Sequence, residues 1–299
     1  MSPLNFTHIL TQAVDELSES ESYQGLFHQH TDGNPLPSAH ALHHIIELAR
    51  AILFPGYFGN STVNSRTVKY HIGVNVERLF DLLSEQILAG LCFGEEGEAC
   101  CCTERQREEA ALQAAKFISC LPQMRRILAT DVEAAYNGDP AAHSLGEVIS
   151  CYPAVRAISN YRMAHQLLRQ GVPLIPRIIT EMAHSETGID IHPGAEIGDH
   201  FTIDHGTGVV IGETCVIGNH VKLYQGVTLG AKSFPLDADG KPIKGIARHP
   251  ILQDNVIIYS NATILGRITV GQGATVGGNI WVTEDVPAGA RLVQTKACK

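Results

Sequence analysis

The sequence lacks the segments that would carry a protein into or across a membrane. No N-terminal stretch of the 299 residues combines a basic start, an apolar run and a small-residue cleavage site. No apolar run is long enough to cross a bilayer. We therefore expect a cytoplasmic protein with no membrane partner.

Charge is scarce as well. Charged side chains make up 18% of the residues, the formal net charge is −9, and no long basic run occurs. Binding to nucleic acid depends on clustered lysine and arginine, so this composition argues against a nucleic-acid partner. Small molecules are the expected ligands.

The eight cysteines lack any spacing that predicts disulfides or a metal site. Cys100, Cys101 and Cys102 are consecutive, so their side chains point in different directions, and no Cys-x-x-Cys motif lies elsewhere. Reduced thiols and no bound metal are the simplest interpretation.

Sustained alternation of apolar and polar residues, typical of a sandwich of short strands, is absent too. Instead, aliphatic residues recur at every sixth position in three series, with a two-residue shift after the first and a long interruption after the second. A six-residue unit suits one short strand and one tight turn, and stacked units form a parallel β-helix around an aliphatic core. The three series are Ile191, Ile197, Ile203; Ile211, Ile217, Leu223, Leu229; and Leu252, Ile258, Ile264, Val270, Val276, Val282.

The N-terminal part of the chain has helical patterns instead. Apolar spacing predicts helices after Ser38 and across Val76–Leu91, and Pro153–Gln170 forms the last one. Between them we expect two helices, Thr103–Ser119 and Pro122–Tyr136, the second with proline in its first turn. The sequence thus predicts an α+β chain: a mainly helical domain of residues 1–187 and a β-helix domain of residues 188–299.

The long interruption in the period, residues 231–247, is rich in turn-forming residues. We expect it to leave the stack as a loop. A long loop in a compact repeat usually has a function. This one leads into Arg248-His249-Pro250.

Five motifs occur in one order and phase and together resemble serine O-acetyltransferase, a hexapeptide-repeat acyltransferase. The resemblance covers roughly the C-terminal half, from about Asp139. It implies a left-handed parallel β-helix that transfers acetyl from acetyl-CoA to L-serine in cysteine biosynthesis. The motifs are Asp190-Ile191-His192-Pro193, Asp204-His205-Gly206-Thr207-Gly208, Gly212-Glu213-Thr214, Gln225-Gly226-Val227-Thr228-Leu229-Gly230 and Arg248-His249-Pro250.

Acetyl transfer to an alcohol requires a base that removes the hydroxyl proton, and a neutral imidazole suits that task. His205 is our candidate. The resemblance assigns to Asp190 the role of the carboxylate that orients this imidazole. The two residues are close to one coil apart in the sequence, so neighbouring coils could bring them together.

Serine also presents a carboxylate and an ammonium group. Arg248 offers a planar fork for the carboxylate, with His249 as a second donor. The resemblance implies that Asp139 and Asp204 pair with the ammonium group, although Asp139 alone would be read as a turn residue before proline. By the same resemblance, Gly230, Ala231, Ser260 and Gly278 lie near the acetyl-CoA groove.

The resemblance also concerns assembly and regulation. It implies a homotrimer, or a dimer of trimers, with active sites between subunits, and inhibition by L-cysteine in the serine pocket. Two departures stand out: the loop before Arg248 is longer than is common in the family, and the chain ends without the C-terminal isoleucine that relatives insert into cysteine synthase. The missing isoleucine puts a complex with cysteine synthase in doubt.

Two other functions fit parts of the pattern. A related acetyltransferase could act on a sugar or another small acceptor, and would not need Arg248 or Asp139. A γ-class carbonic anhydrase shares the β-helix and binds zinc through three histidines. Candidates for that zinc site are His192, His205, His220 and His249.

Overall fold

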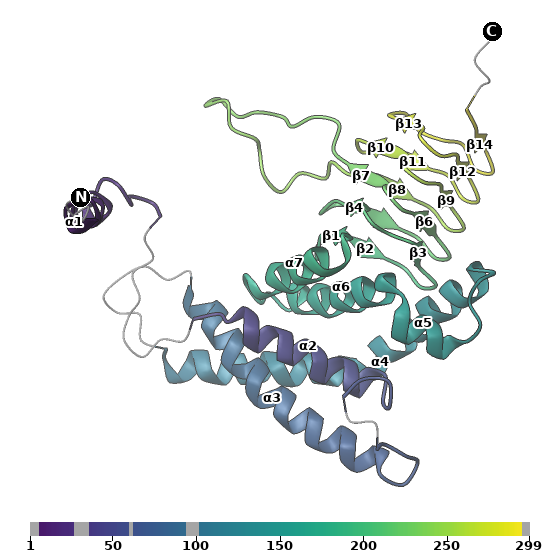
Figure 1. Cartoon of the computed structure of the whole chain (residues 1–299). Coiled ribbons are helices and arrows are strands. Elements are labelled where there is room, and N and C mark those ends of the chain that lie inside the picture. The colour runs from purple at the N-terminus through teal and green to yellow at the C-terminus, as the bar shows by residue number, and fades with distance from the viewer. Residues whose placement is uncertain (1–5, 27–35, 60–61, 94–101, 295–299) are drawn as a thin grey trace, which may run out of the picture.

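The computed structural model describes residues 6–26, 36–59, 62–93 and 102–294, and Figure 1 shows a helical part followed by a β-solenoid. Seven helices lie within the described residues, and none of them is both long and apolar enough to span a bilayer. They are α1 (Phe6–Ser18), α2 (Ala39–Leu53), α3 (Val68–Phe93), α4 (Glu104–Gly138), α5 (Leu145–Cys151), α6 (Pro153–Arg169) and α7 (Ile175–Thr187).

Helix α4 corrects the prediction of two helices in this region. A capping box at Thr103 begins the helix, which continues through Pro122 to Gly138. An internal proline removes one backbone hydrogen bond and costs about 3 kcal/mol. Phe117, Leu121 and Met124 lie on both sides of it at helical spacing and are all buried, and this packing keeps the helix continuous.

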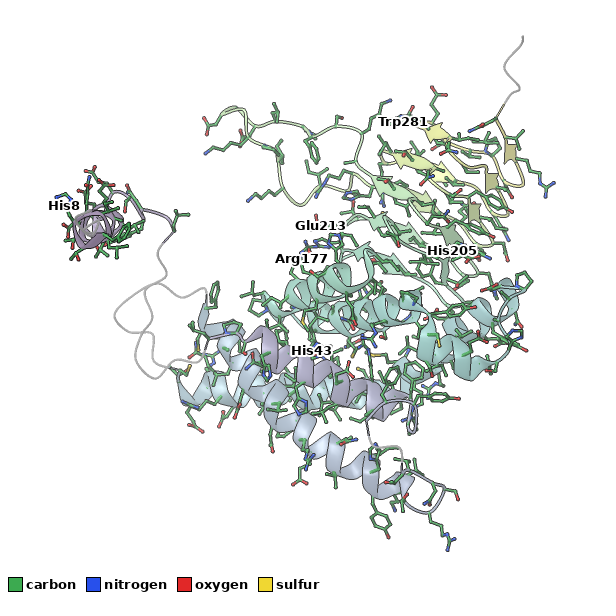
Figure 2. The ribbon with its side chains drawn as sticks, in the orientation of Figure 1. His8, His43, Arg177, His205, Glu213 and Trp281 are labelled. Carbon is green, nitrogen blue, oxygen red and sulfur yellow. The ribbon has the colours of Figure 1, made fainter. Side chains whose placement is uncertain are left out.

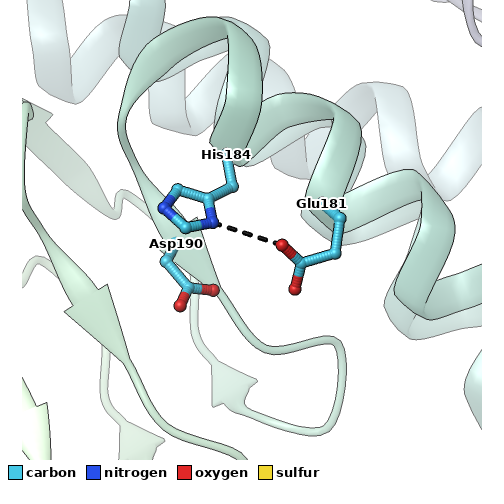
Figure 3. A group of neighbouring side chains, drawn as sticks. All are labelled: Glu181, His184 and Asp190. Atoms are coloured by element: carbon cyan, nitrogen blue, oxygen red, sulfur yellow. Dashed lines mark hydrogen bonds and ion pairs between the residues drawn. The ribbon is translucent and has the colours of Figure 1, made fainter.

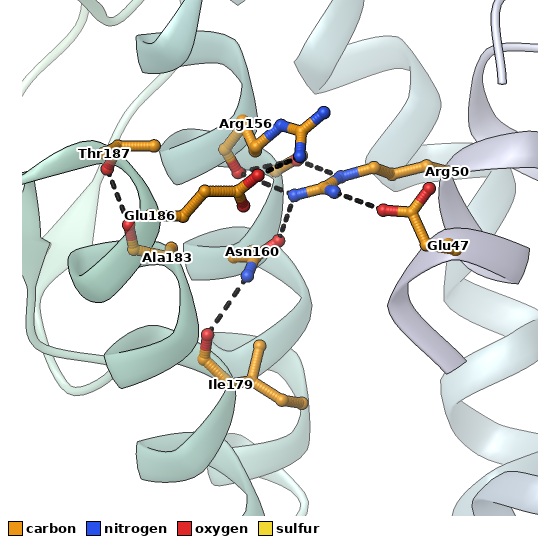
Figure 4. A network of polar contacts seen from close by, with 9 residues as sticks. Glu47, Arg50, Arg156, Asn160, Ile179, Ala183, Glu186 and Thr187 are labelled. Atoms are coloured by element: carbon orange, nitrogen blue, oxygen red, sulfur yellow. Dashed lines mark hydrogen bonds and ion pairs between the residues drawn. The ribbon is translucent and has the colours of Figure 1, made fainter. Parts of the chain in front are cut away.

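A buried arginine joins α2 to α6 (Figure 4). Arg50 is 2% exposed, and its guanidinium donates to Asn160 Oδ1 at 2.6 Å and to Glu47 Oε1 at 2.7 Å. Asn160 in turn donates to the carbonyl of Ile179 in α7 at 3.1 Å. Because a buried charge must be paired, these bonds fix how the three helices pack.

The described residues after α7 form a parallel solenoid, which confirms the β-helix prediction. Its strands form three parallel sheets, with orders β1-β4-β7-β10-β13, β11-β8-β5-β2 and β14-β12-β9-β6-β3. The strands are β1 (Asp190–Ile191), β2 (Glu196–Ile197), β3 (Thr202–Asp204), β4 (Val210–Ile211), β5 (Val216–Ile217), β6 (Lys222–Tyr224), β7 (Thr228–Gly230), β8 (Ile251–Leu252), β9 (Ile257–Ile258), β10 (Thr263–Leu265), β11 (Thr269–Val270), β12 (Thr275–Val276), β13 (Trp281–Val282) and β14 (Arg291–Leu292).

The helices and the first coil share a buried ion pair. Arg162 of α6 donates to both carboxylate oxygens of Asp131 of α4, at 2.6 and 2.8 Å, and to the carbonyl of Gly198 at 2.8 Å. Asp131 also accepts the N–H of Phe201 at 3.0 Å. One continuous cluster of buried apolar residues runs through helices and solenoid. The division into domains at residue 187 therefore stays a prediction.

The chain leaves the stack once between consecutive strands, from Gly230 at the end of β7 to Ile251 at the start of β8. Residues 232–247 of this stretch are exposed, and Figure 1 shows them projecting away from the coils. The loop returns to the solenoid at Arg248 and His249, so it delivers these two side chains to their place on the stack.

Candidate active site

The polar residues of interest lie in two rows of turns on the solenoid. We call the turns after β3, β6, β9 and β12 the His205 edge, and the turns after β1, β4, β7 and β10 the Arg248 edge. Figure 2 shows His205 and Glu213, one from each row, on different sides of the solenoid. The candidate residues therefore fall into two separate groups on one chain.

His205 lies at the two-residue shift in the period. The aliphatic positions Ile203 and Ile211 are eight residues apart instead of six, and the additional residues enlarge the turn after β3. His205 adopts a left-handed backbone conformation there, with φ of 60°, and its side chain is 75% exposed. Its Nε2 lies 3.8 Å from Asp204 Oδ1. The enlarged turn thus places an imidazole beside a carboxylate on the surface.

Asp139 reaches the same edge from the helical part, as the C-cap of α4. It accepts hydrogen bonds from the Tyr152 hydroxyl at 2.5 Å and from the Ala141 N–H at 2.8 Å. The Tyr152 bond, followed by the Ala141 bond, lowers the pKa of the Asp139 carboxyl, and the bond to Asp139 raises the pKa of Tyr152 to about 12. Asp139 is consequently a stable carboxylate at neutral pH, oriented by a phenol that keeps its proton.

Lys222 of β6 pairs with the carboxylate of Asp204 and was not predicted from the sequence. Its Nζ lies 3.0 Å from Asp204 Oδ2 and donates to the carbonyl of Gly138 at 2.7 Å. Sequence reasoning used only the inward position Leu223 of this strand. The sequence did contain a signal for Lys222. The residue precedes an inward aliphatic position, so it lies on the outside of a strand that pairs with the strand of Asp204.

On the Arg248 edge, Arg248 forms an ion pair with Glu213, with Nη2 and Oε2 3.0 Å apart. Its Nε is buried without a hydrogen-bond partner. The rest of the guanidinium is partly exposed, with 23% of the side chain accessible, and it has N–H donors beyond those used by Glu213. These donors are able to bind a further anionic group.

His249 is buried, and hydrogen bonding with Thr214 fixes its ring. Thr214 donates its backbone N–H to His249 Nδ1 at 3.1 Å. Burial, followed by the charge of Arg248, lowers the pKa of His249 to about 4, so the ring is neutral at physiological pH. Because Nδ1 accepts, the proton lies on Nε2, which is a donor for a ligand. A Cβ on Gly212 would lie 2.1 Å from His249 Cδ2, so only glycine fits there.

Asp190 and His205, which were expected to pair, have different neighbours in this chain, and their pairing stays a prediction. In the described part of the molecule, no hydrogen bond or ion pair joins them, and Asp190 instead lies beside Glu181 and His184 of α7 (Figure 3). Candidate ligand atoms of these three residues all lie within 4.8 Å of one another. The coil spacing did not predict this packing of Asp190 against α7.

The residues assigned to acetyl-CoA also divide between the two edges. Gly230 and Ala231 lie at the Arg248 edge, where β7 ends. Ser260 and Gly278 lie at the His205 edge and touch, since a Cβ on Gly278 would be 3.1 Å from the Ser260 carbonyl oxygen. The four residues therefore form two separate pairs within this chain.

The four histidines of the zinc alternative do not gather within one chain. His192 and His249 lie at the Arg248 edge, and His205 lies at the other. His220 instead stacks on His200 in the third row of turns, with ring centroids 4.1 Å apart. Among the described residues, the one group of three candidate metal ligands is Glu181, His184 and Asp190.

Several known proteins are similar to this chain in sequence. No family model matches the chain. A serine acetyltransferase (plasmid) of Synechococcus elongatus is 52% identical over 266 residues, which are 88% of this chain and 83% of that protein. The serine acetyltransferase of Bacillus subtilis is 46% identical over 162 residues, 54% of this chain and 70% of the relative.

Solved structures are similar as well. Serine acetyltransferase 1 of Entamoeba histolytica, in complex with L-cysteine, matches with a TM-score of 0.73 and 34% identity, over 86% of this chain and 96% of that one. The Neisseria gonorrhoeae serine acetyltransferase in complex with serine matches with a TM-score of 0.55 and 25% identity, over 87% and 97%. This chain belongs to the serine acetyltransferase family.

Proposed function

We propose that this protein transfers the acetyl group of acetyl-CoA to the hydroxyl of L-serine, giving O-acetylserine for cysteine biosynthesis in the cytoplasm. The observation that carries the proposal is the division of polar groups between the two edges. Two carboxylates and an exposed imidazole lie on one edge, and a guanidinium with a neutral histidine lies on the other. Serine carries the complementary ammonium, hydroxyl and carboxylate groups.

His205 acts as the general base. Its imidazole takes the proton from the serine hydroxyl as that oxygen attacks the thioester carbonyl of acetyl-CoA. When the carbon–sulfur bond breaks, the imidazolium returns the proton to the thiolate of CoA. The exposure of His205 supports this role, because both substrates must reach the ring.

Asp190 is the carboxylate that we assign to orient the imidazole. The turn of His205 stacks on the residues just before Asp190, since Gly208 donates its N–H to the carbonyl of Gly188 at 2.8 Å. Rotation of the exposed His205 side chain, or its burial by a second subunit, would then bring the ring and the carboxylate together.

The two charged ends of serine are held from opposite sides. Asp139 and Asp204 receive the ammonium group on the His205 edge. Arg248 and the Nε2–H of His249 receive the carboxylate on the Arg248 edge, where a planar guanidinium allows two parallel hydrogen bonds. Glu213 holds Arg248 in place through their ion pair.

Because the edges lie on different sides of one chain, each complete site requires two chains. We infer that the His205 edge of one subunit faces the Arg248 edge of the next in a homotrimer, which can pair further into a dimer of trimers. The groove between them is also the place for acetyl-CoA, with Ser260 and Gly278 from one subunit and Gly230 and Ala231 from the other.

L-cysteine differs from L-serine by sulfur in place of oxygen, so the same groups would bind its ammonium and carboxylate. The complex of the Entamoeba histolytica enzyme with L-cysteine supports this inference. We propose that L-cysteine inhibits the protein by competing with L-serine.

The test is the release of CoA from acetyl-CoA with L-serine, in the wild-type protein and in His205→Ala. Loss of a general base should lower kcat on the order of a hundredfold or more. His220→Ala is the matched control, because His220 lies in the third row of turns. A wild-type protein that ignores serine would contradict the proposal. Full activity in His205→Ala would remove His205 from its role.

A further inference from the structure

Lys222 makes an unusual set of contacts for a lysine on a β-solenoid. Its ammonium bonds to Asp204 at 3.0 Å and to the carbonyl of Gly138 at 2.7 Å, and it lies 4.6 Å from the ring centroid of Tyr224. The side chain is only 16% exposed. These contacts restrict the rotation of the Lys222 side chain, so its ammonium group has a defined position.

These contacts link two elements that are far apart in the sequence. Gly138 is the last residue of α4, and its carbonyl belongs to the negative end of the helix dipole, where a cation is favourable. Asp139 follows directly as the C-cap, while Asp204 ends β3. One ammonium group thus holds the carboxylate of Asp204 and the backbone next to the carboxylate of Asp139.

Lys222 also balances the charge of this edge. Two neighbouring carboxylates repel each other and bind protons more readily unless a cation lies near them. The charge of Lys222 helps to keep the pKa of Asp139 low. With Lys222 in place, the two carboxylates carry one negative charge in excess, which matches one incoming ammonium group.

We propose that Lys222 is a positioning residue that holds Asp139 and Asp204 at the spacing that receives the ammonium group of L-serine. This inference rests on the proposed function. Lys222 does not itself contact the reacting atoms in this account. It acts through the two carboxylates, so its removal affects the recognition of serine and leaves acetyl-CoA binding intact.

The experiment compares Lys222→Met, which keeps most of the aliphatic stem without the charge, with Lys222→Arg, which restores a cation. Lys222→Met removes the bond to Asp204, so the two carboxylates are no longer held in place for the serine ammonium group. The KM for L-serine should then rise by about tenfold or more. We expect the KM for acetyl-CoA to stay within about twofold, and Lys222→Arg to recover part of the serine KM. Lys69→Met removes an exposed lysine of α3 and should change neither value.

Thermal denaturation of each variant separates positioning from folding. If Lys222→Met unfolds early, Lys222→Gln, whose amide can still donate to the Gly138 carbonyl, takes its place in the same assay. A serine KM within about twofold of wild type would contradict the proposal, as would equal losses for both substrates. A lower serine KM would also contradict it, because Lys222 would then compete with the substrate ammonium group for the carboxylates. A wild-type protein that is inactive with serine would instead contradict the proposed function.

Discussion

The backbone N–H of Thr214 donates to Nδ1 of His249 at 3.1 Å, and the Thr214 hydroxyl lies 2.9 Å from the same nitrogen. That hydroxyl also accepts the backbone N–H groups of Arg248 and His249, at 2.9 and 3.1 Å. One threonine therefore fixes the end of the long loop and the tautomer of the histidine that follows it. The free Nε2–H is left to bind a ligand.

His249→Asn should weaken serine binding. The asparagine carbonyl can replace Nδ1 as the acceptor for Thr214, but its amide is too short to take the place of Nε2. Losing one hydrogen bond to a charged carboxylate raises the serine KM by about tenfold. Steady-state kinetics with both substrates would measure this, and an unchanged serine KM would exclude His249 from the pocket.

Stability should fall as the pH is lowered from about 6.5 to about 4. His249 has a folded-state pKa of about 4 because it is buried, whereas an unfolded histidine titrates near 6.5. Between these values the unfolded chain binds more protons, so the free energy of unfolding decreases with falling pH. Burial also lowers the pKa of His165 and His192, which adds in the same direction.

Urea denaturation at pH 7.5 and pH 5 measures this effect. We expect a loss on the order of 2 kcal/mol for wild type. In His249→Asn the loss should be smaller, since one of the three histidines is gone. Equal losses in the two proteins would contradict the assignment to His249.

Asp131→Ala should be among the most destabilising single changes. It would leave the guanidinium of Arg162 buried without its carboxylate and the N–H of Phe201 without its acceptor. Breaking a buried pair in this way costs about 3–5 kcal/mol. Arg177→Gln is the control, because the Arg177–Glu181 pair is exposed and should contribute less than about 1 kcal/mol. Similar urea midpoints for the two variants would contradict the difference.

Chelation should not remove activity. No step of the proposed reaction requires a metal, and we expect protein dialysed against EDTA to keep serine-dependent CoA release within about twofold. A carbonic anhydrase-like protein would hold zinc and lose its activity with it. Loss of activity on dialysis that zinc alone restores would contradict our account, and the cluster of Glu181, His184 and Asp190 would be the first place to examine.

The solenoid was predictable because each six-residue repeat contains one aliphatic residue at a fixed position. Every aliphatic residue of the six-residue series lies in a strand, and all of them are buried except Ile197, which is partly so. The two interruptions of the period were informative for the same reason. One is the enlarged turn that exposes His205, and the other is the loop that ends at Arg248.

The helical part was less predictable. Pro122 favours the first turn of a helix, but the packing of Phe117, Leu121 and Met124 outweighs this local preference and keeps α4 continuous. Helix α7 was not predicted, because the sequence pattern indicated only where α6 ends and where the β-helix begins. Such outcomes depend on tertiary contacts that the pattern of one segment does not contain.

Within the site, the sequence predicted residue types better than their partners. His249 and Arg248 lie together as their adjacency requires, yet their contacts with Thr214 and Glu213 follow from coil stacking. Tyr152 and Lys222 come from elements that do not resemble a motif, so only the fold reveals that they hold Asp139 and Asp204. The expected pairing of Asp190 with His205 could not be decided from spacing, since spacing does not set the direction of an exposed side chain such as His205.

We propose that each active site combines the His205 edge of one chain with the Arg248 edge of another. The most direct test mixes two inactive variants, His205→Ala and Arg248→Ala, by refolding them together. In mixed trimers some interfaces join an intact His205 edge to an intact Arg248 edge, and random mixing in equal amounts should restore about a quarter of wild-type activity. If every site lies within one chain, the mixture stays as inactive as either variant alone, and our account of the site is wrong.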